Sequence, residues 1–142
     1  MLCNLTIHAQ TYWDNIDFYT TKDGLPNNSI LSLHQDRKGF LWIGTFNGLC
    51  RYDGREFKTY TDAFLSKEKN WIASVNCITE DNSGNIWIGT RGGLIARFNV
   101  QKHKWDKHHK SAQAITTLYC DSQNTIWVGT AKGQFGSLTG DS

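Results

Sequence analysis

Three short apolar runs, each centred on a tryptophan, set the pattern of this chain. The runs Leu41-Trp42-Ile43, Ile86-Trp87-Ile88 and Ile126-Trp127-Val128 are each followed by Gly and Thr. Continuous apolar runs of this length are typical of strands that are buried on both faces. We therefore expect a buried central strand in each of three units, with a shared structural motif at Trp42, Gly44, Thr45, Trp87, Gly89, Thr90, Trp127, Gly129 and Thr130.

Each run belongs to a longer repeat that begins with an aspartate. Asp36, Asp81 and Asp121 each stand six residues before the Trp, and the Trp residues are 45 and then 40 residues apart. An Asp-x-x-Gly sequence suits a tight hairpin, because Asp accepts a hydrogen bond from the backbone two residues on and Gly tolerates a positive φ. The third copy has Asn124 in place of the Gly, and Asn is among the residues that adopt this conformation most readily after Gly.

Turn residues divide each repeat into four short strands, A to D, of which strand B carries the Trp. A period of about 40 to 45 residues with four strands is typical of propeller blades. We expect blades at residues 29–61, 72–109 and 113–139. One blade cannot bury both of its faces, so each Trp should pack against a neighbouring blade, and the Gly after it should leave room for that neighbour.

Strand A does not alternate cleanly between apolar and polar positions. Ile30 and Leu33, like their counterparts in the other repeats, are three residues apart. Side chains with this spacing point to opposite faces of a strand unless a bulge intervenes.

The strand count predicts an all-β, incomplete propeller. Ile16–Tyr19 resembles strand D at Phe57–Tyr60, so the order is D, ABCD, ABCD, ABC, and the D strand of the third blade would come from about residues 15–20. Closed propellers usually have about four to eight blades. The open blade faces therefore need further blades, which come either from a longer protein or from copies of this chain in a homo-oligomer.

Composition agrees with one globular unit of 142 residues. The chain is 39% apolar and 20% charged, and its formal net charge of +2 does not indicate a nucleic-acid partner. No run of about 18 apolar residues is present, so we expect no membrane contact by this segment. A 13% aromatic fraction with 13 Gly and one Pro favours strands joined by Gly turns.

The four cysteines form no close pair of the kind that binds zinc or carries redox chemistry. They are far apart in the sequence, at Cys3, Cys50, Cys77 and Cys120. We expect buried small apolar side chains on strands, and one disulfide is the alternative.

Residues 1–10 look like the end of a secretory signal peptide. An apolar stretch ends in a small residue before Gln10, although the basic segment of a signal peptide is missing. We therefore expect the folded part to span residues 11–142. A frayed end of a cytosolic protein is the alternative.

The repeat resembles that of the two-component regulator propeller family. The resemblance is carried by Phe18–Ile30, Gln35-Asp36, Leu41–Thr45, Asn47–Leu49 and Arg51–Asp53, and it covers about residues 16 to 138. The third repeat diverges most, because Gln134 stands where the others have Leu49 and Leu94. The resemblance implies the periplasmic sensor region of a hybrid histidine kinase of Bacteroides-type bacteria, which commonly senses glycan fragments and signals to a kinase that this chain lacks.

The family motif is structural, so ligand contacts are expected in loops. Propeller ligands tend to lie near the axis, at the face where the B–C and D–A loops gather. Side chains there that are suited to sugar binding, by hydrogen bonding and ring stacking, are Phe46, Asn47, Trp71, Arg91 and Lys132. A solvated turn or packing between blades is the alternative for each.

Metal binding and catalysis find little support in the sequence. His103, His108 and His109 lie in one charged run, but they do not share one side of a strand and no carboxylate pair completes a site. A solvated outer strand with lysines that protect its edge explains the run better. No nucleophile, zinc-protease or phosphate-loop motif is present, so we expect no enzyme, no metal and no cofactor.

Three functions stay open at this point. The first is the N-terminal propeller fragment of a periplasmic sensor that binds a glycan fragment. The second is a self-assembling structural mini-propeller or protein-interaction module. The third is a fragment of a propeller lyase.

Overall fold

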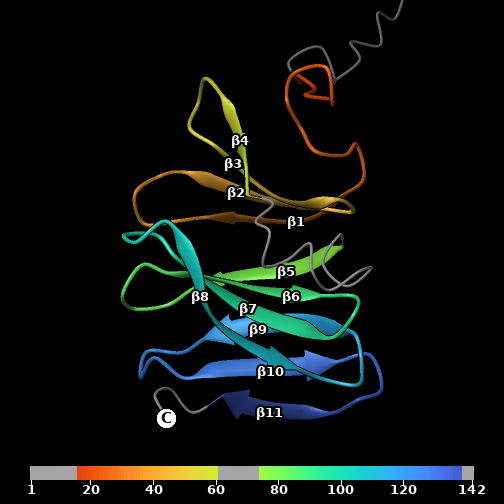
Figure 1. Ribbon diagram of the computed structural model, residues 1–142, viewed down its shortest axis with the longest axis vertical. Coiled ribbons are helices and arrows are strands. Elements are labelled where there is room, and N and C mark those ends of the chain that lie inside the picture. The colour runs from red at the N-terminus through yellow and green to blue at the C-terminus, as the bar shows by residue number, and fades with distance from the viewer. Residues whose placement is uncertain (1–15, 61–73, 139–142) are drawn as a thin grey trace, which may run out of the picture.

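The computed structural model describes residues 16–60 and 74–138, and within these ranges it contains strands and turns but no helix (Figure 1). The strands form three antiparallel sheets. The first contains β1 (Ile30–Gln35), β2 (Leu41–Thr45), β3 (Gly48–Tyr52) and β4 (Phe57–Thr59) in that order. The second contains β5 (Val75–Glu80), β6 (Ile86–Thr90), β7 (Leu94–Asn99) and β8 (Lys104–Lys110). The third contains β9 (Ile115–Cys120), β10 (Ile126–Thr130) and β11 (Phe135–Leu138).

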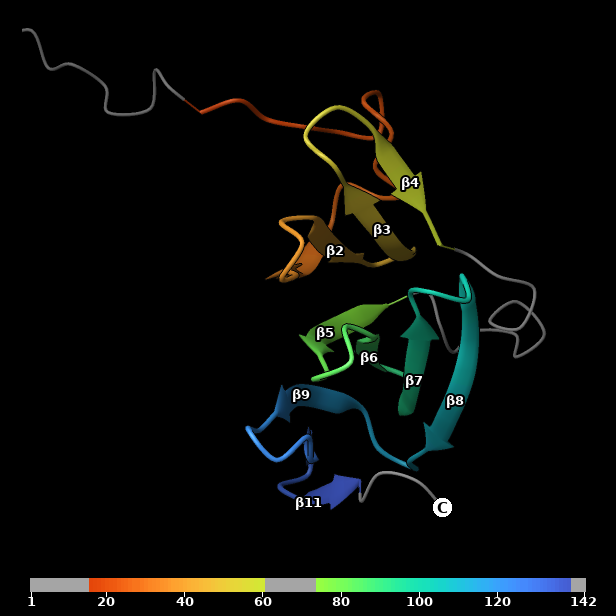
Figure 2. The ribbon, with the colours of Figure 1, turned by 90° about the vertical axis from the view of Figure 1, so that its left-hand side faces the viewer.

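The sheets stack face to face as consecutive propeller blades. In Figure 2, β5 and β9 lie together on one side, and β8, the last strand of its sheet, lies on the other. The first strand of each sheet is therefore the inner one, and β5 lies beside both β1 and β9. This is the all-β, incomplete propeller that the repeats predict.

A bulge resolves the irregular spacing of strand A. In the first blade the register shifts between Ile30 and Ser32, and in the second between Val75 and Cys77. The third blade has the matching irregularity where β9 pairs with β10. One extra residue at the start of each inner strand lets Val75 in the second blade and Ile115 in the third face the blade before them.

Apolar packing between blades forms the core. Trp42 is fully buried in a cluster that includes Val75, Ile88 and Phe98 of the second blade. Trp87 is buried in the next cluster, against Ile115 of the third blade. Each Trp thus packs against the following blade, as expected.

The glycine after each Trp is required by this packing. A Cβ on Gly44 would lie 2.9 Å from Val75 Cγ1 and 2.5 Å from the Val75 carbonyl oxygen. A Cβ on Gly89 would lie 2.5 Å from Ile115 Cγ2. The first residue of each inner strand therefore sits directly on the glycine of the preceding blade, and any side chain there would push the two sheets apart.

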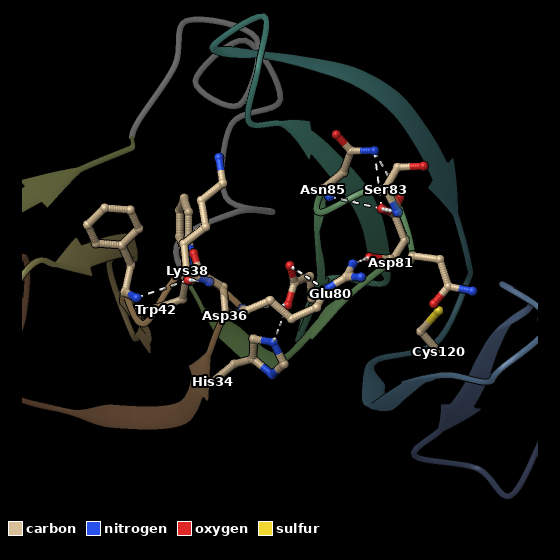
Figure 3. Close-up of polar contacts among 12 residues, drawn as sticks. His34, Asp36, Lys38, Trp42, Glu80, Asp81, Ser83, Asn85 and Cys120 are labelled. Atoms are coloured by element: carbon tan, nitrogen blue, oxygen red, sulfur yellow. Dashed lines mark hydrogen bonds and ion pairs between the residues drawn. The ribbon is translucent and has the colours of Figure 1, made fainter.

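The aspartates of the repeat join the turn to the tryptophan (Figure 3). Asp36 Oδ1 accepts hydrogen bonds from the backbone of Lys38 and Phe40, while Oδ2 accepts one from Trp42 Nε1 at 2.8 Å. The same bond from the indole to Asp81 is 3.0 Å long, and that to Asp121 is 2.8 Å long. One carboxylate thereby closes the hairpin and satisfies the polar atom of an otherwise apolar ring.

Polar contacts at these A–B turns also tie neighbouring blades together. The backbone N–H of Arg37 donates to Glu80 Oε2 at 3.0 Å, and the Arg37 guanidinium donates to Glu80 Oε1 at 3.2 Å and to the Asp81 carbonyl. At the next interface, the backbone N–H of Asn82 donates to Asn124 Oδ1 at 2.7 Å. Asn124 has φ 66°, so it provides both the left-handed turn predicted from the sequence and a bond to the preceding blade.

The register corrects two details of the sequence interpretation. In the second repeat Gly89 pairs with Ile95, and in the third Gly129 pairs with Phe135, so both carry one residue more in the turn than the first, where Gly44 pairs with Leu49. The counterpart of Leu49 is therefore Ile95 rather than Leu94 in the second repeat, and Phe135 rather than Gln134 in the third.

Residues 16–19, which we expected to be a D strand, form no strand in the structure. Instead, Tyr19 packs on the first blade, with its hydroxyl 3.1 Å from that of Tyr52 and its ring against Phe57. The pairing of residues 16–19 with a third blade stays a prediction. The expected signal-peptide remnant, residues 1–10, lies outside the described residues.

The cysteines within the described ranges are free thiols. Cys50 and Cys77 are buried, as predicted, whereas Cys120 is partly exposed. Burial raises the pKa of Cys50 to about 11 and, against a weak opposing hydrogen bond with Gly89, that of Cys77 to about 12. Both side chains are therefore protonated near neutral pH and pack as small apolar groups.

We expect Trp87→Ala to cost about 3–5 kcal/mol of unfolding free energy, because the variant leaves a cavity between two blades. Trp127→Ala is the matched control: Trp127 carries the same bond to an aspartate but is only half-buried. Its cost should be clearly smaller in urea unfolding experiments. Equal losses of unfolding free energy in the two variants would contradict the conclusion that Trp87 packs against the following blade.

Asp121, in the turn between β9 and β10, should make the free energy of unfolding depend on pH. Bonds from the Trp127 indole and from the backbone of Thr125 lower the pKa of Asp121. A lowered folded-state pKa contributes stability that is fully present above the unfolded value of about 3.9 and is lost as the pH falls through the folded value. Asp121→Asn should be less stable than the unmodified chain near neutral pH, and the difference should shrink below about pH 4. Urea unfolding across this range tests it, and a difference that stays constant would contradict it.

Candidate functional site

The candidate site is the end of the blades at which the B–C turns lie. Strands of an antiparallel sheet alternate in direction, so the β2–β3, β6–β7 and β10–β11 turns all lie at one end (Figure 1). The segments that lead into the inner strands, residues 20–29 and 111–114, reach the same end. We call this end the loop face.

One backbone hydrogen bond joins the two kinds of loop in every blade. The N–H of Phe46 donates to the Ser29 carbonyl at 3.0 Å. The corresponding bonds, from Arg91 to Ser74 and from Ala131 to Ala114, are 3.1 and 3.0 Å long. The backbone of the loop face is therefore regular, and its variable chemistry lies in the side chains.

The motif threonine fixes the B–C turn. Thr45 Oγ1 donates to the Gly48 carbonyl at 3.0 Å and accepts from the Asn47 N–H at 3.1 Å. In the second blade, Thr90 Oγ1 accepts from the Leu94 N–H at 3.0 Å. These hydroxyls hold the turns that carry the candidate side chains, a role that the sequence analysis did not assign to the motif threonine.

Four of the five predicted ligand residues lie exposed on the loop face. Phe46, Asn47, Arg91 and Lys132 all occupy B–C turns. Among the described residues, no hydrogen bond, ion pair or ring contact joins any two of these four side chains. The fifth, Trp71, lies outside the described residues.

Charge distinguishes the loop face from the opposite end of the blades. Arg91 and Lys132 give its B–C turns two cations, and neither these turns nor residues 111–114 carry a carboxylate. Asp36, Asp81 and Asp121, the aspartates that bond to the motif tryptophans, all lie at the opposite end.

The structure has two hollows beside the third blade that the sequence analysis did not predict. One, of about 310 Å³, is lined by Thr117, Tyr119, Trp127, Val128, Gly129 and Phe135. The other, of about 400 Å³, lies between the second and third blades, with Ile95 and His109 of the second blade and residues 134–138 of the third in its lining. The first hollow lies over Trp127 and Gly129, the motif Trp and Gly of the third repeat.

Residues 104–110 of the charged run form β8, an outer strand as predicted, while residues 102 and 103 lie in the turn before it. Lys104, His109 and Lys110 are exposed, while Trp105 faces the core. Asp106 accepts a bond from Arg97 Nε at 2.8 Å. Across residues 16–60 and 74–138, no three His, Cys, Asp or Glu side chains gather to hold a metal ion, and no helix is long and apolar enough to cross a membrane.

Comparison with known families matches the repeats directly. The family described as the two-component regulator propeller matches residues 24–47, 71–92 and 110–132. Each match includes the A–B turn of one blade, the strand that carries its Trp, and the start of its B–C turn.

Solved structures and a curated relative agree with this match. The extracellular domain of a hybrid two-component system from B. thetaiotaomicron is 27% identical, with a TM-score of 0.73 over 88% of this chain and 17% of that one. A second such domain from the same organism is 25% identical, with a TM-score of 0.66 over 84% of this chain and 19% of the other. Histidine kinase P4 of Formosa agariphila is 45% identical over 42 residues, which is 30% of this chain and 3% of the kinase. The chain therefore spans only a small part of these relatives.

The B–C turn of the second blade should depend on Gly93. A Cβ there would lie 2.2 Å from the Ser111 carbonyl oxygen and 2.7 Å from that of Gln113. Gly133 is the matched control, because its φ of 77° is close to the 87° of Gly93 but its Cβ would meet nothing within 4 Å. We expect Gly93→Ala to cost about 2 kcal/mol or more beyond Gly133→Ala. Urea unfolding measures both, and similar costs would show that backbone strain alone matters.

Proposed function

Because its three repeats are those of the two-component regulator propeller family, we propose that this chain forms part of the extracytoplasmic sensor region of a hybrid two-component system. The observation that carries the proposal is the match of all three blades, supported by the fold shared with extracellular domains of such systems. The location that goes with this role is the periplasm, and the histidine kinase would belong to other parts of a longer protein.

We further propose that the loop face binds the signal ligand and that the ligand is a glycan fragment. The turns present an aromatic ring at Phe46, an amide at Asn47 and cationic donors at Arg91 and Lys132. Sugars combine apolar C–H faces with many hydroxyl acceptors, and this set of side chains suits both. Trp71 would add a second ring.

The charges of the loop face favour an acidic glycan over a neutral one. Arg91 and Lys132 lie on turns of adjacent blades, and neither has an ion pair among the described residues. A cation without a carboxylate partner pays no cost of breaking an ion pair when it binds an anionic group. Uronic-acid residues of a glycan would supply such a group.

Calorimetric titration with a panel of neutral and uronate-containing oligosaccharides tests the proposal on this chain. We expect binding by at least one acidic member, weakened about tenfold in Arg91→Ala or Lys132→Ala through loss of a charged hydrogen bond. Arg55→Ala and Lys38→Ala are matched controls, because both cations lie in turns at the opposite end of the blades.

The outcomes separate the parts of the proposal. Binding that the loop-face and control variants weaken equally would contradict the loop face as the site. Binding of neutral oligosaccharides alone would contradict the acidic class, and absence of binding across the panel would contradict a glycan ligand.

A further inference from the structure

Residues 111–114 join β8 of the second blade to β9 of the third, and they lie between the turns that carry Arg91 and Lys132. We infer that this segment forms a subsite for the carboxylate of an acidic sugar, and that Gln113 distinguishes this carboxylate from a neutral group. The inference deepens the function proposed above and rests on it. It names the group that the ligand places on the loop face and a binding residue beyond the five candidates.

The second blade fixes the start of the segment. The N–H of Ser111 donates to the Gly93 carbonyl at 2.8 Å. A Cβ on Gly93 would lie 2.2 Å from the Ser111 carbonyl oxygen and 2.7 Å from that of Gln113. The backbone of the segment therefore lies directly against the turn that carries Arg91, which is two residues before Gly93.

The third blade fixes the end of the segment. The N–H of Ala131 donates to the Ala114 carbonyl at 3.0 Å, and Thr130 Oγ1 donates to Gln113 Oε1 at 2.9 Å. Thr130 and Ala131 immediately precede Lys132. Gln113 is thus held between the two turns, with its backbone against one and its side chain bonded to the other. A site whose parts are fixed before binding loses less conformational freedom when the ligand arrives.

The motif threonine of the third blade has a role here that its counterpart in the first blade lacks. Thr45 Oγ1 donates to the Gly48 carbonyl, inside its own turn. Thr130 Oγ1 lies 3.4 Å from the corresponding carbonyl, of Gln134, and makes its shorter bond to Gln113. The hydroxyl therefore orients a side chain of the neighbouring segment as well as the turn.

The polar groups that remain available around the segment are donors. Because Gln113 Oε1 accepts from Thr130, the Nε2 amide group is left to donate. It donates to no group within residues 16–60 and 74–138, and it is not among the buried polar atoms that lack a partner. Ser111 Oγ accepts from the Gln113 N–H at 3.1 Å, which leaves its hydroxyl hydrogen to donate.

This set of donors suits a carboxylate better than a sugar hydroxyl. Arg91 and Lys132 have only donors, and they add positive charge to the Gln113 amide between them. An ionised carboxylate has only acceptors, and its hydrogen bonds to donors of this kind are about twice as strong as those between neutral groups. A hydroxyl would leave the charge of the cations without a partner.

Calorimetry with oligogalacturonate and oligoglucuronate, each compared with its neutral methyl ester, tests the inference. Gln113→Glu keeps the oxygen that accepts from Thr130 but replaces the donor amide with a carboxylate. We expect the affinity for the acid form to fall about tenfold or more through repulsion of like charges, and the affinity for the ester to change little. Gln123→Glu is the matched control, because it makes the same change in the turn between β9 and β10, at the opposite end of the blades.

The side-chain amide of Gln113 gives a direct measurement on the unmodified chain. In proton–nitrogen correlation spectra, its Nε2–H signals, assigned by their loss in Gln113→Glu, should shift when the acid form is added and stay in place with the ester. The corresponding signals of Gln123 should not move with either. Circular dichroism checks that both variants keep the fold.

The outcomes separate this inference from the proposed function. Binding of the acid form that Arg91→Ala weakens but Gln113→Glu leaves unchanged would overturn the inference and leave the loop face as the site. Equal losses for acid and ester, equal losses in Gln113→Glu and Gln123→Glu, or Gln113 amide signals that stay in place would also overturn it. Absence of binding by every oligosaccharide would overturn both.

Discussion

Every sheet of this protein depends on one contact, the seating of an aliphatic side chain on a glycine of the preceding sheet. Val75 lies on Gly44 and Ile115 on Gly89, and the neighbouring Trp42 and Trp87 are buried only because the following sheet covers them. A four-stranded sheet with two apolar faces is not stable alone in water. The stability of each blade is therefore largely a property of its interfaces. Trp127, which no later sheet covers among the described residues, is only half-buried.

The side chains at the two ends of the blades differ in what they contact. At the A–B end, carboxylates close hairpins, hold indole rings and, through neighbours such as Glu80, bond to the adjacent blade. These residues are committed to the fold. At the loop face the turns are held by backbone bonds and the motif threonine, which leaves side chains such as Arg91 and Lys132 exposed. A repeat built this way can change the exposed side chains of these turns without disturbing the contacts that hold the blades.

Most of the fold could be predicted from the sequence, because the repeat places the same physical requirement in each copy. The buried central strands, the positive φ at Asn124 and the packing of each Trp on the next blade could be inferred from residue type and spacing. The sequence showed that the apolar spacing of strand A is irregular but did not decide whether a bulge is present, because the bulge depends on the position of the neighbouring sheet. The register of Phe135 was misassigned because a turn one residue longer keeps the motif Thr and Gly in place and shifts only the strand after them. Four of the five candidate side chains lie on B–C turns, as expected, but their role in ligand binding stays a prediction, because no local pattern encodes how side chains of separate blades lie relative to one another.

The bond between Asn82 and Asn124 has a consequence for how such repeats can evolve. The Arg37 turn is matched to a carboxylate on the blade after it, whereas the Asn82 turn is matched to an amide. Recombination that deleted the second blade would leave the Arg37 guanidinium without this carboxylate, because Cys120 stands at the position of Glu80 in the third blade. Gain or loss of a whole blade therefore disrupts polar contacts between neighbouring turns even where the repeats align well. These contacts constrain the order of the blades.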